Sequence, residues 1–288
     1  MRRLSIPTSL AIAALTLCAA AAPASAQRYN DWTDVEGSET CRAIWKEFGR
    51  TMRGRPIAVY CEVRDVGTRP STGTVSVDAA EKEGILVRGS GRRDVHVSLV
   101  IQAQGRSVED AHALANLVKL DLSDKSLRVS GIDDDFSDRH FVAATMLIDA
   151  PHESDLTLSV GTAPLTVENV VGRMELRADH GPLSLLNVGG DVRARVEYGP
   201  LSVDLDGPRW QGTRLDAESE YGPVTLSLPK NFGAALEIGA EHGPFLVDFP
   251  ITLTRLDGSS IQTKLGAGGP PVRAVARYGP MSMRMKGG

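Results

Sequence analysis

Aromatic residues precede a repeated Gly-Pro pair in the second half of the chain: His180, Tyr198, Tyr221, His242 and Tyr278. Tyrosine and histidine rings stack on one another, and rings that stay exposed bind sugars or protein partners. If successive repeats lie on top of one another, the rings form a column with a spacing of about 4.8 Å. Two interpretations stay open: a packing column that holds the repeats together, or a binding strip that includes Tyr198, Tyr221 and His242.

A second, mainly acidic series runs one residue ahead of the rings: Asp179, Glu197, Glu220, Glu241 and then Arg277. Stacked carboxylates can bind Ca²⁺ through their oxygens, and solenoid enzymes that cleave acidic polysaccharides carry carboxylates on one face. The more ordinary interpretation is a solvated stripe that discourages aggregation. Glu197, Glu220 and Glu241 are the candidate binding residues of this series.

Sequence patterns typical of catalysis and of metal binding are missing. The chain contains neither Gly-x-Ser-x-Gly nor His-Glu-x-x-His. His180 and His242 would lie three repeats apart, roughly 14 Å at the strand spacing. One zinc ion cannot bridge them, because its bonds to nitrogen are about 2 Å long. The sequence therefore predicts no catalytic residue, no metal site and no cofactor, and we expect a protein that is not an enzyme.

The spacing of the repeats indicates which elements would position these side chains. The proline of each repeat, from Pro164 to Pro280, recurs at intervals of 18, 18, 23, 21 and 36 residues. Apolar residues alternate with polar ones on both sides of the corner, as Leu201, Val203 and Leu205 do. A period of two is typical of a strand with one buried face.

Each Gly-Pro pair is interpreted as a corner between two strands, because proline has no N–H to donate and glycine supplies backbone freedom. The predicted fold is mainly β, with a C-terminal parallel β-solenoid of coils of about 20 residues. An antiparallel series of hairpins that turn at Gly-Pro is the alternative. In the last interval we expect a loop or a degenerate coil near residues 261–265, followed by a final capping turn.

Upstream of the repeats, residues 67–150 predict a small α+β region. Strands are expected at 74–78, 84–88 and 95–101, near Leu127 and at 141–148. A short helix is expected after Ser107, which would form a capping box with Asp110. Its buried face would consist of Ala111, Leu114, Leu117 and Val118.

The first 26 residues have the features of a signal peptide. Arg2 and Arg3 precede an apolar stretch, and Ala24-Ser25-Ala26 provides small residues for cleavage. Loss of these two arginines changes the formal net charge from −4 to −6, which argues against nucleic-acid binding. No second apolar run has membrane length, so the mature chain is expected to lack a transmembrane anchor. We expect export to the periplasm or the cell surface.

Two cysteines, Cys41 and Cys61, belong to the predicted mature chain. In an oxidising compartment they most simply form one disulfide. It would close a loop of about twenty residues and stabilise the protein by roughly 3 kcal/mol. The expected organisation is a signal peptide (1–26), a disulfide-closed segment (27–66), the α+β region (67–150) and the solenoid (151–288).

From Cys61 onward the chain resembles the bacterial DUF4097 family. The matching motifs are Cys61-Glu62-Val63-Arg64, Gly84-Ile85-Leu86-Val87-Arg88-Gly89, Asp138-Arg139-His140, Ser154-Asp155-Leu156 and Val247-Asp248-Phe249-Pro250. Members of that family usually have Asn-Gly-Gly at the corner, where this chain has Tyr-Gly-Pro or His-Gly-Pro. The resemblance implies a β-solenoid of adhesin type.

Taken together, these features predict an exported, non-enzymatic protein of the cell envelope, adhesin-like or scaffolding. Its partner would be an envelope protein or a glycan that the sequence does not identify. The alternative is a solenoid that binds or cleaves carbohydrate through the ring and acidic series.

Overall fold

The structure is a computed structural model that describes residues 58–123, 125–132, 140–250, 255–257 and 259–286. The predicted signal peptide, Cys41 and Asp138-Arg139 lie outside these residues. The Cys41–Cys61 disulfide therefore stays a prediction. No helix within the described part of the chain has the length and apolar character needed to cross a membrane.

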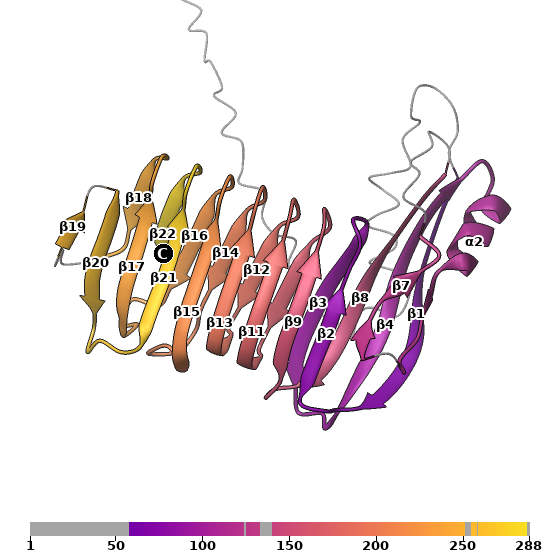
Figure 1. Ribbon diagram of the computed structural model, residues 1–288, viewed down its shortest axis with the longest axis horizontal. Coiled ribbons are helices and arrows are strands. Elements are labelled where there is room, and N and C mark those ends of the chain that lie inside the picture. The colour runs from indigo at the N-terminus through magenta and orange to yellow at the C-terminus, as the bar shows by residue number, and fades with distance from the viewer. Residues whose placement is uncertain (1–57, 124, 133–139, 251–254, 258, 287–288) are drawn as a thin grey trace, which may run out of the picture.

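Strands dominate the protein, as predicted, and most of them form two ten-stranded sheets (Figure 1). The order of the first sheet is β1 (Ala58–Pro70), β4 (Asp94–Gly105), β8 (Phe141–Pro151), β3 (Glu83–Ser90), β10 (Leu165–Glu168), β12 (Leu183–Leu186), β14 (Leu201–Asp204), β16 (Val224–Leu228), β22 (Met281–Met285) and β18 (Phe245–Asp248). The order of the second is β19 (Arg255–Asp257), β20 (Ser260–Leu265), β17 (Ala234–Ala240), β21 (Pro271–Ala276), β15 (Gly212–Ser219), β13 (Gly189–Val196), β11 (Val171–Ala178), β9 (Asp155–Val160), β2 (Thr74–Asp78) and β6 (Ser126–Leu127).

Each repeat contributes one strand to each sheet, and we call such a pair of strands a coil. Neighbouring coils pair in parallel and in register, so Leu183 lies opposite Leu201 and Leu201 opposite Val224. The parallel pairing of the repeats is thus confirmed, and the antiparallel alternative for them is wrong. The strands β2 and β3 pair in the same way with β9 and β10, and β1 runs through the expected boundary at residue 66. The division of the chain into domains stays a prediction.

The spatial order of the coils differs from their order in the chain. The coil β21/β22 lies between coil β15/β16 and coil β17/β18 in both sheets, as the yellow strands in Figure 1 show. The expected capping turn after residue 265 is therefore wrong. That end of the second sheet is formed instead by β20, antiparallel to β17, and by β19, antiparallel to β20.

An aliphatic interior joins the two sheets. Side chains that face inward from both sheets form one continuous buried cluster, and Leu165, Leu183, Leu201 and Val224 are each at most 1 % exposed. Burial of one such side chain stabilises the fold by about 1.5–3 kcal/mol. The core therefore extends along the whole stack and is not confined to one end.

Glycine is required at the corners for a reason that the sequence did not reveal. None of the corner glycines has a positive φ, so backbone freedom is not what they supply. A Cβ on Gly199 would lie 2.2 Å from the carbonyl oxygen of Gly181, and one on Gly222 would lie 1.9 Å from that of Gly199. The corners of adjacent coils approach so closely that no side chain fits between them.

The predicted helix is α2 (Val108–Leu117), which packs on β4 and β1. The Oγ of Ser107 accepts a hydrogen bond from the N–H of Asp110 at 3.2 Å. The Asp110 carboxylate, in turn, accepts from the N–H of Arg106 and not from that of Ser107. Ala111 and Val118 are buried as expected, but Leu117 is 57 % exposed, because the helix ends there and Ala115 occupies the inward position. A two-stranded sheet of β5 (Lys119–Leu120) and β7 (Val129–Ser130) follows.

Candidate functional site

The rings predicted to form a column do stack, and we call them the ring ladder. In spatial order they are His180, Tyr198, Tyr221, Tyr278 and His242, with centroid separations of 4.8, 4.8, 5.1 and 4.9 Å. Their planes are inclined to each other by 9–17°. Tyr278 lies between Tyr221 and His242, so the expected order, with Tyr278 last, is wrong. His180 and His242 are consequently four steps apart instead of three.

Backbone hydrogen bonds at the corners set the spacing of the ladder. The N–H of Tyr198 donates to the carbonyl of Asp179, and the N–H of Tyr221 donates to that of Glu197, both at 2.7 Å. The same bond recurs from Tyr278 to Glu220 at 2.7 Å. Because glycine follows each ring, adjacent corners come close enough for the rings to stack at an offset-stacking distance.

The ladder is exposed at its edges and covered on its faces. Tyr198, Tyr221 and Tyr278 are 49 %, 47 % and 54 % exposed, although each has a ring stacked on both faces. A sugar that packs against an aromatic face would find an outward ring face only at the terminal histidines. What the tyrosines offer to a partner is a row of phenol hydroxyls, each of which can donate and accept hydrogen bonds.

The acidic series flanks the ladder but is not continuous. Arg277 lies between Glu220 and Glu241, because its N–H bonds to the carbonyl of Ser219 and its neighbour Ala276 accepts from the N–H of Glu241. The Nε of Arg277 forms an ion pair with Glu218 at 2.8 Å. Among the described residues, no group of three or more His, Cys, Asp or Glu side chains is arranged to hold a metal ion.

A nearby carboxylate affects the hydroxyl of Tyr221. The charge of Glu220, with smaller contributions from burial and from the neighbouring tyrosines, raises the pKa of Tyr221 above its ordinary value. A phenol with the ordinary tyrosine pKa of about 10 is already protonated at neutral pH, and the raised pKa extends the protonated form of Tyr221 to higher pH.

A charged face on the second sheet was missed by the sequence analysis. Its central row is formed by the residue six positions before each corner glycine; in spatial order these are Glu175, Arg193, Asp216, Arg273 and Glu237. The signs alternate along the row. Ion pairs join Arg193 to Glu175 at 2.9 Å and Arg273 to Asp216 at 2.8 Å. The fixed offset from the corner is the signal that could have revealed it.

Arg273 and Asp216 are the centre of a larger network on this face. Arg273 also pairs with Glu218 at 2.8 Å, and Asp216 also pairs with Arg195 at 2.5 Å. Partial burial by itself would raise the pKa of the Asp216 carboxyl, but the hydrogen bonds from Arg195 and Arg273 outweigh it and lower that pKa. The ion pairs thus favour the charged form of Asp216.

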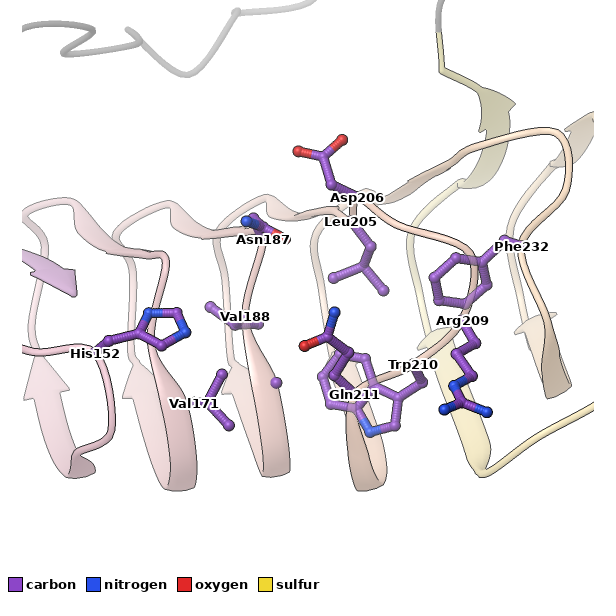
Figure 2. Close-up of a pocket in the computed structure, with 11 residues that line it drawn as sticks. His152, Val171, Asn187, Val188, Leu205, Asp206, Arg209, Trp210, Gln211 and Phe232 are labelled. Atoms are coloured by element: carbon purple, nitrogen blue, oxygen red, sulfur yellow. The ribbon is translucent and has the colours of Figure 1, made fainter. Parts of the chain in front are cut away.

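A cavity of about 200 Å³ lies at the opposite corner of the coils, where the chain returns to the second sheet (Figure 2). It is lined by Trp210 and Gln211 together with residues of several other coils, among them Val188 and His152. Trp210 is 2 % exposed, and its indole N–H has no hydrogen-bond partner in the described part of the chain. A space of this size accommodates ordered water, which commonly satisfies such a group.

Comparison with known proteins does not establish a family. No family model and no curated protein matches the sequence. One similar solved structure is a "putative cell adhesion protein" from Clostridium sporogenes, with a TM-score of 0.38, 12 % identity, and coverage of 79 % of this chain and 100 % of that one. A "putative adhesin" from Bacteroides fragilis has a TM-score of 0.35, 14 % identity, and coverage of 78 % and 97 %. A "putative lipid binding protein" from Parabacteroides distasonis has a TM-score of 0.27, 10 % identity, and coverage of 77 % and 96 %. Likeness at these values supports no conclusion about activity.

Proposed function

We propose that the protein is an exported, non-enzymatic component of the cell envelope, built as a parallel β-solenoid that presents an adhesin-like or scaffolding surface. The observation that carries this proposal is the exposed ring ladder. Five rings at a regular spacing form a row along one corner of the stack, where an extended partner can contact several coils at once. Tyrosine is enriched at such interfaces, because it buries a large surface and keeps a polar tip.

Two features favour recognition of a partner over cleavage of a polysaccharide. The tyrosine faces are covered by neighbouring rings, which leaves hydroxyl edges for binding. Arg277 also interrupts the acidic series next to Glu220, so these carboxylates do not form the uninterrupted row that the sequence suggested. We take Tyr198, Tyr221 and His242, flanked by Glu197, Glu220 and Glu241, as the contact surface for an envelope protein or a glycan.

The export signal, the disulfide and the four-part division of the chain belong to the same proposal. When the protein is exported by its natural host, mass spectrometry should find a mature chain that begins at Gln27. Without a reducing agent its mass should be two hydrogens below that of the reduced sequence, because Cys41 and Cys61 form a disulfide. A mature protein that starts elsewhere, or that has free thiols at Cys41 and Cys61, would contradict this part of the proposal.

The contact surface can be tested with a variant that removes the hydroxyls and keeps the rings. The double variant Tyr198→Phe, Tyr221→Phe should lose binding to immobilised envelope extract and to a glycan array at an unchanged melting temperature. Tyr60→Phe is the matched control, because Tyr60 belongs to β1 and packs against His112, away from the ladder. Equal binding by the double variant would exclude the hydroxyl row as the contact surface. Polysaccharide turnover that is lost in Glu220→Gln would favour the enzymatic alternative instead.

A further inference from the structure

The coil β21/β22 fills a slot inside the stack. We use "slot" for the space between coil β15/β16 and coil β17/β18. The coil pairs in parallel with both neighbours in both sheets. Its inward side chains Val272, Ala274, Met281 and Met283 are all completely buried. The coil is therefore a complete layer of the core, although it comes last among the described strands.

The walls of the slot carry negative charge, and the coil carries the positive charge between them. Asp216 and Glu237 occupy equivalent positions on the two walls, and Arg273 lies opposite both. Arg273 approaches Asp216 to 2.8 Å and Glu237 to 3.6 Å. Arg277, which belongs to the same coil, lies between Glu220 and Glu241 along the stack. Without this coil the two walls would bring like charges together, which is unfavourable across neighbouring strands.

The segment that joins the coil to the rest of the chain contains several glycines. It runs from the end of β20 to the start of β21, and Gly266, Gly268 and Gly269 have φ values of 50°, 83° and 156°. Glycine adopts such conformations readily and keeps many others accessible. The connection can therefore act as a hinge that lets the coil lie in one place or another.

We propose that the slot accepts the same coil from a second copy of the chain, so that copies associate by exchanging β21/β22. The exchanged coil would make the contacts seen here, Arg273 with Asp216 and Arg277 with Glu218 included. Exchange of an identical element leaves the interactions unchanged and requires only that the hinge extend. Reciprocal exchange between two copies closes a dimer. The interaction surface is the slot, and the partner is another molecule of this protein.

Cysteine pairs across the slot provide the test. Thr225 on β16 lies directly opposite Ser282 on β22, and neighbouring strands are about 4.8 Å apart, within the range that a disulfide spans. Two full mature chains, one with Thr225→Cys and one with Ser282→Cys, are unfolded together, refolded at high concentration and oxidised. Exchange predicts a covalent dimer on a non-reducing gel, in an amount that increases with chain concentration.

Two controls make the result decisive. The mixture of Thr166→Cys and Ser282→Cys should lose the dimer, because Thr166 lies on β10, separated from β22 by three strands of the first sheet. A single chain that carries both Thr225→Cys and Ser282→Cys reports whether the two positions meet at all. If this double variant forms its internal disulfide and the mixture gives no more dimer than the Thr166 control, the exchange is refuted. If neither crosslinks, the pairing on which the proposal rests is itself refuted. Neither outcome depends on any external partner, so the test is independent of the proposed function.

Discussion

Replacement of Arg273 by methionine tests whether charge holds the inserted coil in place. Methionine keeps much of the aliphatic stem of arginine and removes the guanidinium group. That group donates to Asp216 and Glu218, both at 2.8 Å. After the substitution Asp216 still pairs with Arg195, and Glu218 still pairs with Arg277. The variant thus removes two charged hydrogen bonds and the longer ion pair with Glu237 at 3.6 Å, and it leaves Asp216 and Glu218 paired.

The free energy that the hydrogen bonds of Arg273 contribute lies between two limits. Hydrogen bonds to charged groups contribute about 1.5–3 kcal/mol each, whereas exposed ion pairs contribute about 0.2–1 kcal/mol. The Arg273 side chain is 30 % exposed, which places it between these cases. We expect Arg273→Met to lower the free energy of opening of the coil by about 2 kcal/mol, roughly a thirtyfold increase in the open population.

Native-state hydrogen exchange on the β21 amides is the appropriate assay, because a long stack of repeats need not unfold in one step. Arg284→Met is the matched control: Arg284 belongs to the same coil but is exposed, and its side chain donates to Ser282 at 3.2 Å. A surface change of this kind is expected to stay within about 0.5 kcal/mol. In 1 M salt, where the screening length is about 3 Å, the difference between the two variants should shrink. Equal exchange rates for β21 in both variants at low salt would refute the reasoning.

Three further predictions follow from the corners and the charged face. Gly222→Ala should lower the free energy of unfolding in urea by more than the roughly 1–3 kcal/mol typical of overpacking, because its Cβ would lie 1.9 Å from a backbone oxygen. Gly91→Ala is the control, since a Cβ on Gly91 meets nothing within 4 Å. Equal urea midpoints for the two variants would contradict the close approach of the corners. The pKa of Asp216 is lower in the folded protein than in the unfolded chain, so its ionised form stabilises the fold. This stabilisation is complete above the ordinary carboxyl pKa of about 3.9 and is lost as pH falls through the lower folded-state pKa. The urea-midpoint difference between wild type and Asp216→Asn should therefore be constant near neutrality and shrink in acid, and a difference that instead grew in acid would reverse the assigned sign. Tyr198→Ala should lower the melting temperature, because it removes two stacked contacts, each worth about 0.5–1.5 kcal/mol. Tyr198→Phe keeps the ring and should leave the melting temperature unchanged. Equal melting temperatures for wild type and both variants would show that the ladder does not stabilise the corner.

Much of the fold is readable from the sequence, because the stack is built from local repeats. The strand at residues 74–78 has the predicted bounds, and alternation of apolar residues correctly identified buried inward side chains such as Leu201, Val203 and Leu205. The ring ladder was also predictable, since equivalent residues of parallel strands in register must lie next to one another. These features depend only on period and register, which the sequence displays directly.

What the sequence did not reveal depends on contacts between coils. The corner glycines are fixed by a neighbouring carbonyl oxygen, whose position follows only from the stacked structure. Leu117 fits the helical period, but the helix ends at that residue and leaves it exposed. The cavity beside Trp210 forms where the coil is longer than its neighbours, in the interval of 23 residues between Pro200 and Pro223. An interval shows that residues were added but not how they pack.

The position of the last coil could have been inferred from the signs of the charges. Six residues before each corner glycine the chain has, in sequence order, Glu175, Arg193, Asp216, Glu237 and Arg273. Stacked in that order, Asp216 and Glu237 would be neighbours and would repel each other. Placing Arg273 between them gives an unbroken alternation of sign, which is the arrangement observed. Apolar periodicity predicts that the coils stack, but it does not predict their order, because every coil has the same aliphatic interior. Charge in this row differs from coil to coil, and the row alternates in sign only when coil β21/β22 lies between its two observed neighbours.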